Sequence, residues 1–523
     1  METISSITQD SYSPGTNIWV KIIIIIQLSL LAVQFNPEPS TNGDNAVYYV
    51  LGKSLADGTG YRRMHEAGMP VESSYPVLFP VFIAITQFFS DNPVFPQICM
   101  GVLGALITLL CYYLFRRTLP PGLLLPLLIL VASSRLLMEY QIALMTETPY
   151  VVLTLAALLM LRKSLDNPKS RIWFWGAIAV SVMPVHCRTV GIAFCAAWII
   201  GNLTAKRYRY ALAHAVLAAI TIAVYVLLTP GSNAYAREGA LLNIYDPEMG
   251  AITSQDLVMR VMENIKIHAG ILFPKAFLYF NNRPPLPLLM TVFQLPSVFA
   301  LFGWAKGLFG RDRIISLYCV LYTCIIISWS IVSERRLVCI LPFLLYFMIV
   351  GLRMTIDAIR MAHRFSWQQA KLLFTDRTPG PVPAAGTIAV FAAAFIIAFV
   401  NINARAGFAA ETRRTPDWTN FYSCADWVRE NAPTDAVVMS RKPELVYLRS
   451  RHRGMVYPYS HDVDHIVDAM KAAGVRYVIY DDFSWTQTTL KYLYPVIISH
   501  PDYFKIVYAL NNPYTFVFEF APK

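Results

Sequence analysis

Charged side chains are scarce in this chain of 523 residues, at 15% of the sequence against 56% hydrophobic residues, and the mean hydropathy is +0.46. Soluble globular domains carry about 25% charged residues. Long apolar runs account for the shortage of charge in this chain. The composition therefore excludes an ordinary soluble protein and predicts a chain that crosses a membrane several times.

The sequence also lacks the marks of a disulfide-stapled or cleaved secretory protein. The first apolar run, at residues 18–35, is not followed by a small-residue cleavage site, which favours a retained membrane helix. Cys424 stands alone in a polar tail, and the other seven cysteines lie in or beside apolar segments. Neither a disulfide framework nor a zinc site is indicated.

A net charge of +11, from 44 Lys and Arg against 33 Asp and Glu, raises the question of nucleic-acid binding. Much of the excess falls in short loops between apolar runs, which is the positive-inside pattern of membrane proteins. The expected environment is therefore the lipid bilayer, and no nucleic-acid partner is predicted.

The order of apolar runs and basic loops predicts a topology of about eleven transmembrane helices, with the amino terminus in the cytoplasm. Residues 119–138 are expected to form one of these spans, and residues 229–285 a long outer loop. The basic loop at 353–377 would be cytoplasmic, and the last span, at 384–400, would lead out of the cytoplasm.

The first outer loop, at about residues 36–93, is polar and punctuated by Gly and Pro. Apolar and aromatic residues at near-helical spacing in 44–55 predict a short amphipathic helix lying on the membrane, with Asp44 in its first turn. The run at 76–89 is too short for a full crossing, so a second interfacial helix is expected.

The tail differs in kind from the rest of the chain. Residues 436–439 and 477–480 are typical of strands, and residues 419–430 and 463–473 of amphipathic helices, with Gly474 as a helix stop. We therefore predict a membrane domain at residues 1–402 and a small extracytoplasmic α/β domain at residues 403–523.

The predicted topology gathers several charged residues on the outer face, where they end or interrupt apolar runs. They are Asp44, Glu72, Glu139, Glu147, His186, Arg188, Glu334, Arg335 and Arg336. Charges at such positions cost a few kcal/mol and are rarely idle. Taken singly, each also has a structural interpretation: a helix-cap acid at Asp44, a solvated loop charge at Glu147, a lipid-facing arginine at Arg188, a structural histidine at His186, or a local ion-pair cluster at 334–336.

Five short motifs occur in a fixed order. An acid follows the first helix, then come L-x-x-G-x-G-Y at residues 55–61, Y-P-x-L-F-P at 75–80 and M-T-E-T-P at 145–149. H-C-R-T-V-G at 186–191 and E-R-R-L-V-C-I-L-P-F-L at 334–344 complete the set. Over about the first 400 residues this order resembles the GT-C class of integral-membrane glycosyltransferases, in particular the bacterial relatives of protein O-mannosyltransferases and lipid A aminoarabinose transferases.

The resemblance implies roles for individual residues. Asp44 corresponds to the first-loop acid, a catalytic base or acceptor-positioning carboxylate, and Glu147 to the second acid. Arg335 corresponds to the arginine that meets the donor phosphate, and Arg188 to a basic position of the same pocket. Glu72 loosely matches a position that binds metal or donor in some members.

Further pocket positions are the neighbours of these motifs, namely Tyr75, His186, Glu334 and Arg336. A divalent cation, Mg²⁺ or Mn²⁺, held by Asp44 and Glu147 is one option within the class.

Three positions depart from the family pattern. Asn45 stands where protein O-mannosyltransferases tend to have a second acid, and Arg336 occupies a tyrosine position. No lysine immediately precedes Tyr75, where aminoarabinose transferases carry one. The first departure weighs against a protein acceptor.

The sequence thus predicts an inverting glycosyltransferase of the bacterial inner membrane with an extracytoplasmic active site. Its donor would be a polyprenyl-phosphate sugar and its acceptor a glycan or glycolipid. Two alternatives stay open: a protein O-glycosyltransferase, and a non-catalytic transporter or flippase of lipid-linked sugars.

Overall fold

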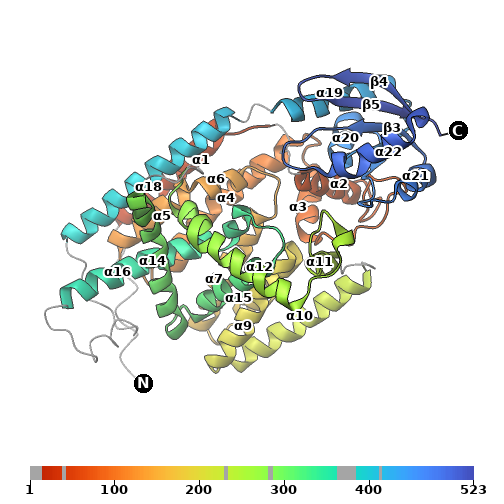
Figure 1. Ribbon diagram of the computed structural model, residues 1–523. Coiled ribbons are helices and arrows are strands. Elements are labelled where there is room, and N and C mark those ends of the chain that lie inside the picture. Colours follow the sequence, from red (N-terminus) through yellow and green to blue (C-terminus); the bar gives the residue numbers. More distant parts are fainter. Residues whose placement is uncertain are drawn as a thin grey trace. The chain divides into compact units, whose positions relative to one another are not determined.

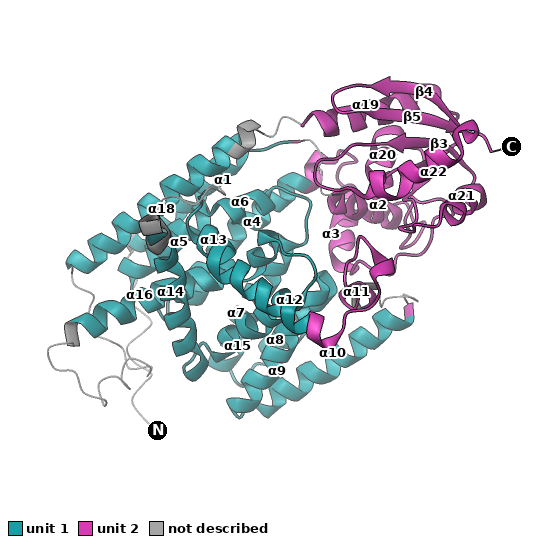
Figure 2. Ribbon diagram, in the orientation of Figure 1, with its two compact units in different colours: residues 1–36, 97–227, 257–409 teal, residues 37–96, 228–256, 410–523 magenta. Residues whose placement is uncertain are grey.

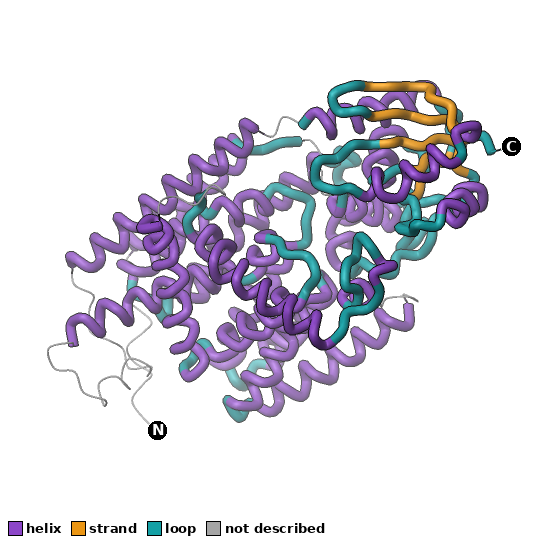
Figure 3. The backbone as a smooth tube through the Cα atoms, in the orientation of Figure 1, coloured by secondary structure: helices purple, strands orange, loops and turns teal. Residues whose placement is uncertain are grey.

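The computed structural model describes residues 14–37, 43–228, 234–280, 287–361, 384–411 and 415–522 (Figure 1). Helices make up most of this chain, and the strands lie in its carboxyl-terminal part (Figure 3). The chain folds as two compact units, drawn in different colours in Figure 2. Unit 1 comprises residues 1–36, 97–227 and 257–409, and unit 2 comprises residues 37–96, 228–256 and 410–523.

In its described residues, unit 1 consists of helices joined by loops. Its α-helices are α1 (Pro14–Val33), α4 (Val94–Phe115), α5 (Pro121–Ser133), α6 (Arg135–Gln141), α7 (Glu147–Asp166), α8 (Arg171–Cys187), α9 (Ile192–Thr204), α10 (Tyr208–Leu228), α12 (Ser254–Ile267), α13 (Phe273–Phe277), α14 (Pro287–Phe309), α15 (Arg313–Ser328), α16 (Leu341–Met361) and α18 (Ala384–Glu411). Shorter helical turns are η1 (Thr189–Gly191), η3 (His268–Leu272) and η4 (Glu334–Cys339).

Seven helices of the described chain are long and apolar enough to cross a membrane, or eight if the bent pair α5 and α6 forms one span. Three shorter apolar helices, Leu78–Gln87, Thr189–Thr204 and Arg313–Ser328, accompany them. The predicted multi-pass membrane protein is therefore confirmed, whereas the figure of about eleven spans stays a prediction. The predicted cytoplasmic loop at 353–377 and the outer loop at 229–285 lie partly outside the described residues.

The run expected to form one span at 119–138 is instead broken, with α5 and α6 meeting at an angle of 55°. Ser134 joins them in an extended conformation, and its side chain accepts a hydrogen bond from the Leu137 backbone N–H as the cap of α6. Arg135 then begins the new helix and is buried in protein. A continuous helix would leave this arginine in the middle of an apolar run, and the bend directs it to carboxylate partners instead.

Helices α14 and α16 pack closely along each other at two glycines. A Cβ atom placed on Gly303 would lie 1.9 Å from the carbonyl oxygen of Phe347, and one placed on Gly351 would lie 1.8 Å from that of Phe299. Each glycine therefore admits the backbone of the other helix. Such small-residue contacts are a common way for membrane helices to approach one another.

Unit 2 is a mixed α/β unit. Its helices are α2 (Asp44–Ala56), α3 (Leu78–Gln87), α11 (Ala234–Gly239), α19 (Pro416–Asn431), α20 (Pro443–Ser450), α21 (Val463–Ala472) and α22 (Tyr494–Ser499), with the short turns η2 (Pro247–Met249), η6 (Thr489–Leu493) and η7 (Pro501–Tyr503). Its strands are β1 (Val437–Met439), β2 (Gly454–Met455), β3 (Val475–Tyr480), β4 (Phe504–Leu510) and β5 (Thr515–Phe520).

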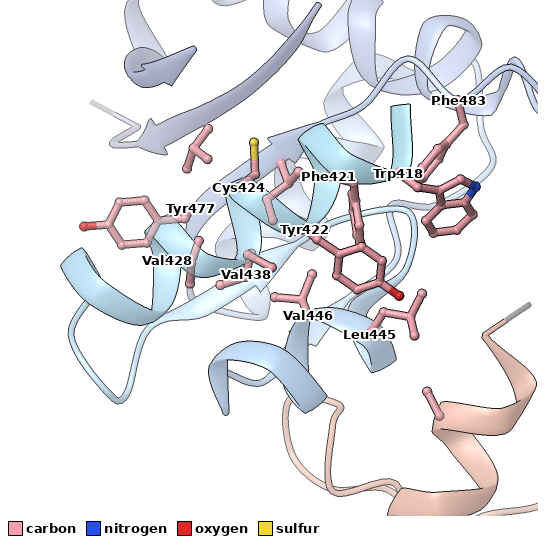
Figure 4. Close-up of a cluster of buried hydrophobic side chains, with 14 of the residues drawn as sticks. Trp418, Phe421, Tyr422, Cys424, Val428, Val438, Leu445, Val446, Tyr477 and Phe483 are labelled. Carbon is pink, nitrogen blue, oxygen red and sulfur yellow. The ribbon is translucent and has the colours of Figure 1, made fainter. Parts of the chain in front are cut away.

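The five strands form one sheet in the order β2-β1-β3-β5-β4, in which β2, β1 and β3 run parallel and β4 and β5 pair antiparallel. Aromatic and aliphatic side chains of α19, including Phe421, pack with Val438 of β1 and Leu445 of α20 in a buried core (Figure 4). The predicted strands and helices of the tail are all present, and Gly474 ends α21 at φ +67°. That conformation favours glycine.

The predicted helix at the start of the first outer loop is present as α2, and the second as α3. Helix α2 differs from the expected surface helix because its residues 45–52 are all buried by protein. Ala46 packs into the same core as α19, and a Cβ on Gly52 would clash with Ile83 of α3. The first outer loop and the tail thus share one core. The predicted domain boundary at residue 402 stays a prediction.

Candidate active site

Glu147 is the centre of a buried charge cluster in unit 1. It is the first residue of α7, its side chain is fully buried, and its Oε1 lies 2.5 Å from Arg335 Nε and 2.6 Å from an Arg188 terminal nitrogen. The other carboxylate oxygen, Oε2, has no hydrogen-bond partner among the described residues. The structure brings Glu147, Arg188 and Arg335 together in this unit, and the roles assigned to them from the sequence stay predictions.

Local structure holds both arginines on this carboxylate. Arg188 directly follows α8 in an extended conformation, and it also donates a hydrogen bond to Thr146 Oγ1 at 2.5 Å. The turn that follows needs a glycine, because a Cβ on Gly191 would lie 2.5 Å from the Val185 backbone nitrogen. Arg335 lies in η4, where its backbone N–H is bound by the side chain of Ser333.

Two cationic side chains meet at one carboxylate. Arg188 and Arg335 share Glu147, and both arginines keep an exposed edge, with 18% of the Arg188 and 21% of the Arg335 side chain accessible. A guanidinium carries five N–H donors and no acceptor. The arrangement is therefore suited to an incoming anion with several oxygens, such as a phosphate.

Glu334, next to Arg335, belongs to a second ion-pair group. It lies 2.7 Å from Arg135 and 3.4 Å from Lys275, and Arg135 also pairs with Glu139 at 3.1 Å. The sequence analysis did not assign Arg135 or Lys275 to the site. The signal for Arg135 was available, since an arginine inside an apolar run needs a buried partner.

Two other predicted pocket residues have different neighbours. The Arg336 guanidinium lies 5.2 Å from the centre of the Trp329 ring, and the backbone oxygen of Arg336 accepts a hydrogen bond from Tyr322. His186 lies against the ring of Tyr225. Neither Arg336 nor His186 is among the ion-pair partners that Glu147 has in the described structure.

Unit 2 contains the other predicted acid, Asp44, at the first position of α2. The Tyr75 hydroxyl donates a hydrogen bond to Asp44 Oδ1 at 2.9 Å. Tyr75 is itself fixed, because its carbonyl oxygen accepts from the Tyr61 hydroxyl at 2.8 Å and its ring meets that of Tyr48 edge-on. A rigid phenol thus orients the carboxylate, a common requirement for a general base.

Glu72 stabilises the loop that carries Tyr75. It is fully buried, its carboxylate receives two hydrogen bonds from Arg63, at 2.7 and 3.1 Å, and it also accepts from the backbone N–H groups of Ser74 and Tyr75. The pair raises the pKa of Arg63 above its usual value even though burial opposes this. Glu72 therefore fixes the loop that carries Tyr75. The sequence analysis overlooked Arg63, which has no distinctive motif.

Two more carboxyl groups feel the charge of Asp44. Burial raises the pKa of Glu238 and that of Glu444, and the negative charge of Asp44 adds to both shifts. Glu238 and Glu444 come from segments about 190 and 400 residues away in the sequence, so no local pattern could reveal them. At these two positions the protonated form of the acid is favoured.

No family model matches this sequence, and no curated protein matches it. Solved structures do match. ArnT from Cupriavidus metallidurans bound to undecaprenyl phosphate has a TM-score of 0.60 at 10% identity, over 97% of this chain and all of that chain. AglB from Archaeoglobus fulgidus, in complex with an inhibitory peptide and a dolichol-phosphate, has a TM-score of 0.53 at 11% identity, over 97% of this chain and 75% of that chain. This chain has the GT-C fold.

A further GT-C structure, the Archaeoglobus fulgidus oligosaccharyltransferase in complex with Zn and sulfate, matches with a TM-score of 0.54 at 10% identity, over 95% of this chain and 73% of that chain. Among the described residues of the present chain, no group of three or more His, Cys, Asp or Glu is placed to hold a metal ion. The surroundings of Glu147 do not fit one either, because two guanidinium groups next to its Oε1 repel a cation. The predicted Mg²⁺ or Mn²⁺ stays a prediction.

Proposed function

We propose that this GT-C protein is an inverting glycosyltransferase that moves a sugar from a polyprenyl-phosphate donor to an extracytoplasmic glycan or glycolipid. The observation that carries the proposal is the paired guanidinium cluster of Arg188 and Arg335 on the buried Glu147. The fold supports it, since the matching ArnT and AglB structures were solved with undecaprenyl phosphate and a dolichol-phosphate.

The reaction needs positive charge at the leaving group. The acceptor oxygen forms a bond to the anomeric carbon while the bond from that carbon to the phosphate oxygen breaks, and the electron pair passes to the phosphate. Arg335 and Arg188 would stabilise this developing charge, bidentately where the geometry permits. Glu147 would hold the two guanidinium groups in place, because like charges so close together would otherwise separate.

The acceptor hydroxyl must lose its proton during the attack. Asp44 is the proposed base, and a positioned general base contributes roughly 10²- to 10⁴-fold to the rate. Tyr75 would orient the carboxylate through its hydrogen bond to Oδ1. A single displacement from the face opposite the leaving phosphate inverts the configuration at the sugar carbon.

The proposal includes the location of the protein. We place it in the bacterial inner membrane with about eleven crossings, Asp44 outside and the loop after α4 in the cytoplasm. A single cysteine at Arg116 should then be shielded from an impermeant thiol reagent applied from outside. Labelling of that cysteine in intact cells would refute the orientation.

The deciding experiment is sugar transfer by the purified protein from a panel of radiolabelled polyprenyl-phosphate donors. Arg335→Ala and Asp44→Asn should each abolish turnover. Two matched controls should retain it: Arg171→Ala, an exposed arginine at the start of α8, and Asp57→Asn, an exposed acid just after α2. Equal turnover in Asp44→Asn and Asp57→Asn would refute the role of Asp44.

The same experiment separates the alternatives. Labelled sugar found on a secreted protein, and lost in Asp44→Asn, would replace the glycan acceptor with a protein acceptor. Tight donor binding without turnover of any donor, together with lipid translocation that survives Asp44→Asn, would favour a transporter or flippase of lipid-linked sugars.

A further inference from the structure

Three buried polar side chains without hydrogen-bond partners lie at one edge of the sheet in unit 2. Strands β1 and β3 run parallel, and the residues that directly follow them are Ser440, Arg441 and Asp481. Ser440 Oγ, Arg441 Nε and Asp481 Oδ2 are buried and have no partner among the described residues. Buried polar atoms are nearly always paired in native proteins, so three together need an explanation.

Arg441 is the most informative of the three. Its side chain is only 8% exposed, and it forms neither an ion pair nor a hydrogen bond with the residues that the structure describes. Instead its guanidinium carbon lies 5.1, 5.5 and 5.8 Å from the ring centres of Trp485, Tyr459 and Tyr245. Contacts with aromatic rings compensate only part of the cost of burying a charge. A ligand anion would supply the missing acceptors.

Exposed aromatic surface lies beside this arginine. Trp485 is 44% and Tyr245 is 38% exposed. The segment that carries Tyr245 is fastened to the sheet unit, because Lys491 pairs with Asp246 at 2.5 Å and the Tyr492 hydroxyl donates to the Tyr245 carbonyl oxygen at 2.8 Å. The backbone at Tyr245 is therefore held in position, which lowers the entropic cost of binding.

The place in the fold also points to a ligand. In open α/β sheets, ligands bind outside the carboxyl ends of parallel strands, where side chains of neighbouring strands converge. Tyr457, which follows β2, adds a hydroxyl at this edge that is hydrogen-bonded to Thr488 and Thr489. Thr489 also donates to Asp481 Oδ1 at 3.0 Å, so one oxygen of this acid is fixed, and the other has no partner among the described residues.

We propose that this edge, formed by Arg441, Asp481, Trp485, Tyr245 and Tyr459, is a second binding site that takes an acidic saccharide. The acid group of the sugar pairs with the Arg441 guanidinium, and the apolar face of the sugar ring packs on Trp485. We infer the negative charge of the ligand from Arg441 and its apolar face from Trp485. That the ligand is a saccharide rests on the proposed function.

Binding of trigalacturonic acid to the purified full-length protein in detergent, measured by calorimetry, tests this inference. The fully methyl-esterified trisaccharide is the matched ligand without negative charge. The wild type should bind the acid more tightly than the ester by roughly 10- to 100-fold. Arg441→Met should remove this preference, and Trp485→Ala should weaken the binding of both ligands.

Two variants control for general damage to unit 2. Arg476, at the amino-terminal end of β3, and Tyr514, an aromatic residue before β5, are both more than half exposed, and Arg476→Met and Tyr514→Ala should bind like the wild type. Equal affinity for acid and ester, no binding of either, or an unchanged preference in Arg441→Met would each overturn the site. Saccharide binding without sugar transfer would uphold the site and refute only the glycosyltransferase function. Sugar transfer without saccharide binding would uphold the function and refute the site.

Discussion

The close contact between α14 and α16 gives a prediction that does not depend on the reaction. A methyl group on Gly303 would lie 1.9 Å from the Phe347 carbonyl oxygen, and real Cβ atoms do not come nearer than about 3.0 Å to such an atom. Gly303→Ala therefore requires the two helices to separate by roughly 1 Å. Overpacking of this kind costs roughly 1–3 kcal/mol.

A matched control removes the effect of helix propensity. Gly101 lies in α4, and a Cβ there meets no atom within 4 Å. Gly101→Ala should keep the stability gain of up to about 1 kcal/mol that alanine gives over glycine in a helix. In thermal unfolding of the detergent-solubilised protein, Gly303→Ala should unfold at a clearly lower temperature than Gly101→Ala.

A double variant tests the geometry further. Gly351→Ala would bring a methyl group 1.8 Å from the Phe299 carbonyl oxygen at the same crossing. One separation of the helices relieves both clashes, so Gly303→Ala and Gly351→Ala together should cost less than the sum of the single variants. Equal stability of Gly303→Ala and Gly101→Ala, or full additivity, would refute the packing argument.

Three further predictions concern the site and unit 2. Tyr75→Phe should lower the turnover number about 10-fold or more in the transfer assay, because Asp44, the proposed base, loses its orienting hydroxyl, whereas Tyr61→Phe, which removes a bond of similar length to a backbone oxygen, should have a smaller effect. Glu147→Gln should weaken donor binding and cost roughly 3–5 kcal/mol of stability, because it removes the buried carboxylate charge that Arg188 and Arg335 share, and unchanged thermal unfolding would contradict this. Burial raises the pKa of Asp481 to about 7, so the folded unit holds this proton longer than the unfolded chain, and stability should fall by at most roughly 1.4 kcal/mol per unit as the pH rises from about 4 to about 7. Asp481→Asn should flatten that dependence, whereas the same change at the exposed Asp482 should leave it intact.

The helices of unit 1 were largely predictable from the sequence because a long apolar run by itself indicates a membrane helix. The run predicted at 94–115 coincides with α4, and α1, α7, α10 and α14 occur where long apolar segments stand. The bend between α5 and α6 was not predicted. The bend occurs next to Arg135, which pairs with Glu334, a residue 199 positions away, and hydropathy contains no information about such a partner.

The acids and arginines of the candidate site could be selected from the sequence. The contacts that hold them in place could not. Charges at the ends of apolar runs are costly, so Asp44, Glu147, Arg188 and Arg335 stand out in a sequence with few charged residues. The pairing of both arginines with one carboxylate oxygen depends on three separate segments. The anchoring of Tyr75 by Glu72 likewise depends on how a polar loop folds back on itself.

The sequence by itself determined the membrane character, the positions of most helices and strands, and the set of charged residues from which a site is drawn, because hydrophobicity and periodicity are local properties of the chain. Only the tertiary structure decided that helix α2 is buried beside the tail, that Glu147 is held by two arginines, and that Arg441 lies among aromatic rings with no ion-pair partner in the described part of the chain. These features depend on contacts between residues tens to hundreds of positions apart, and their energies arise only when the chain has folded.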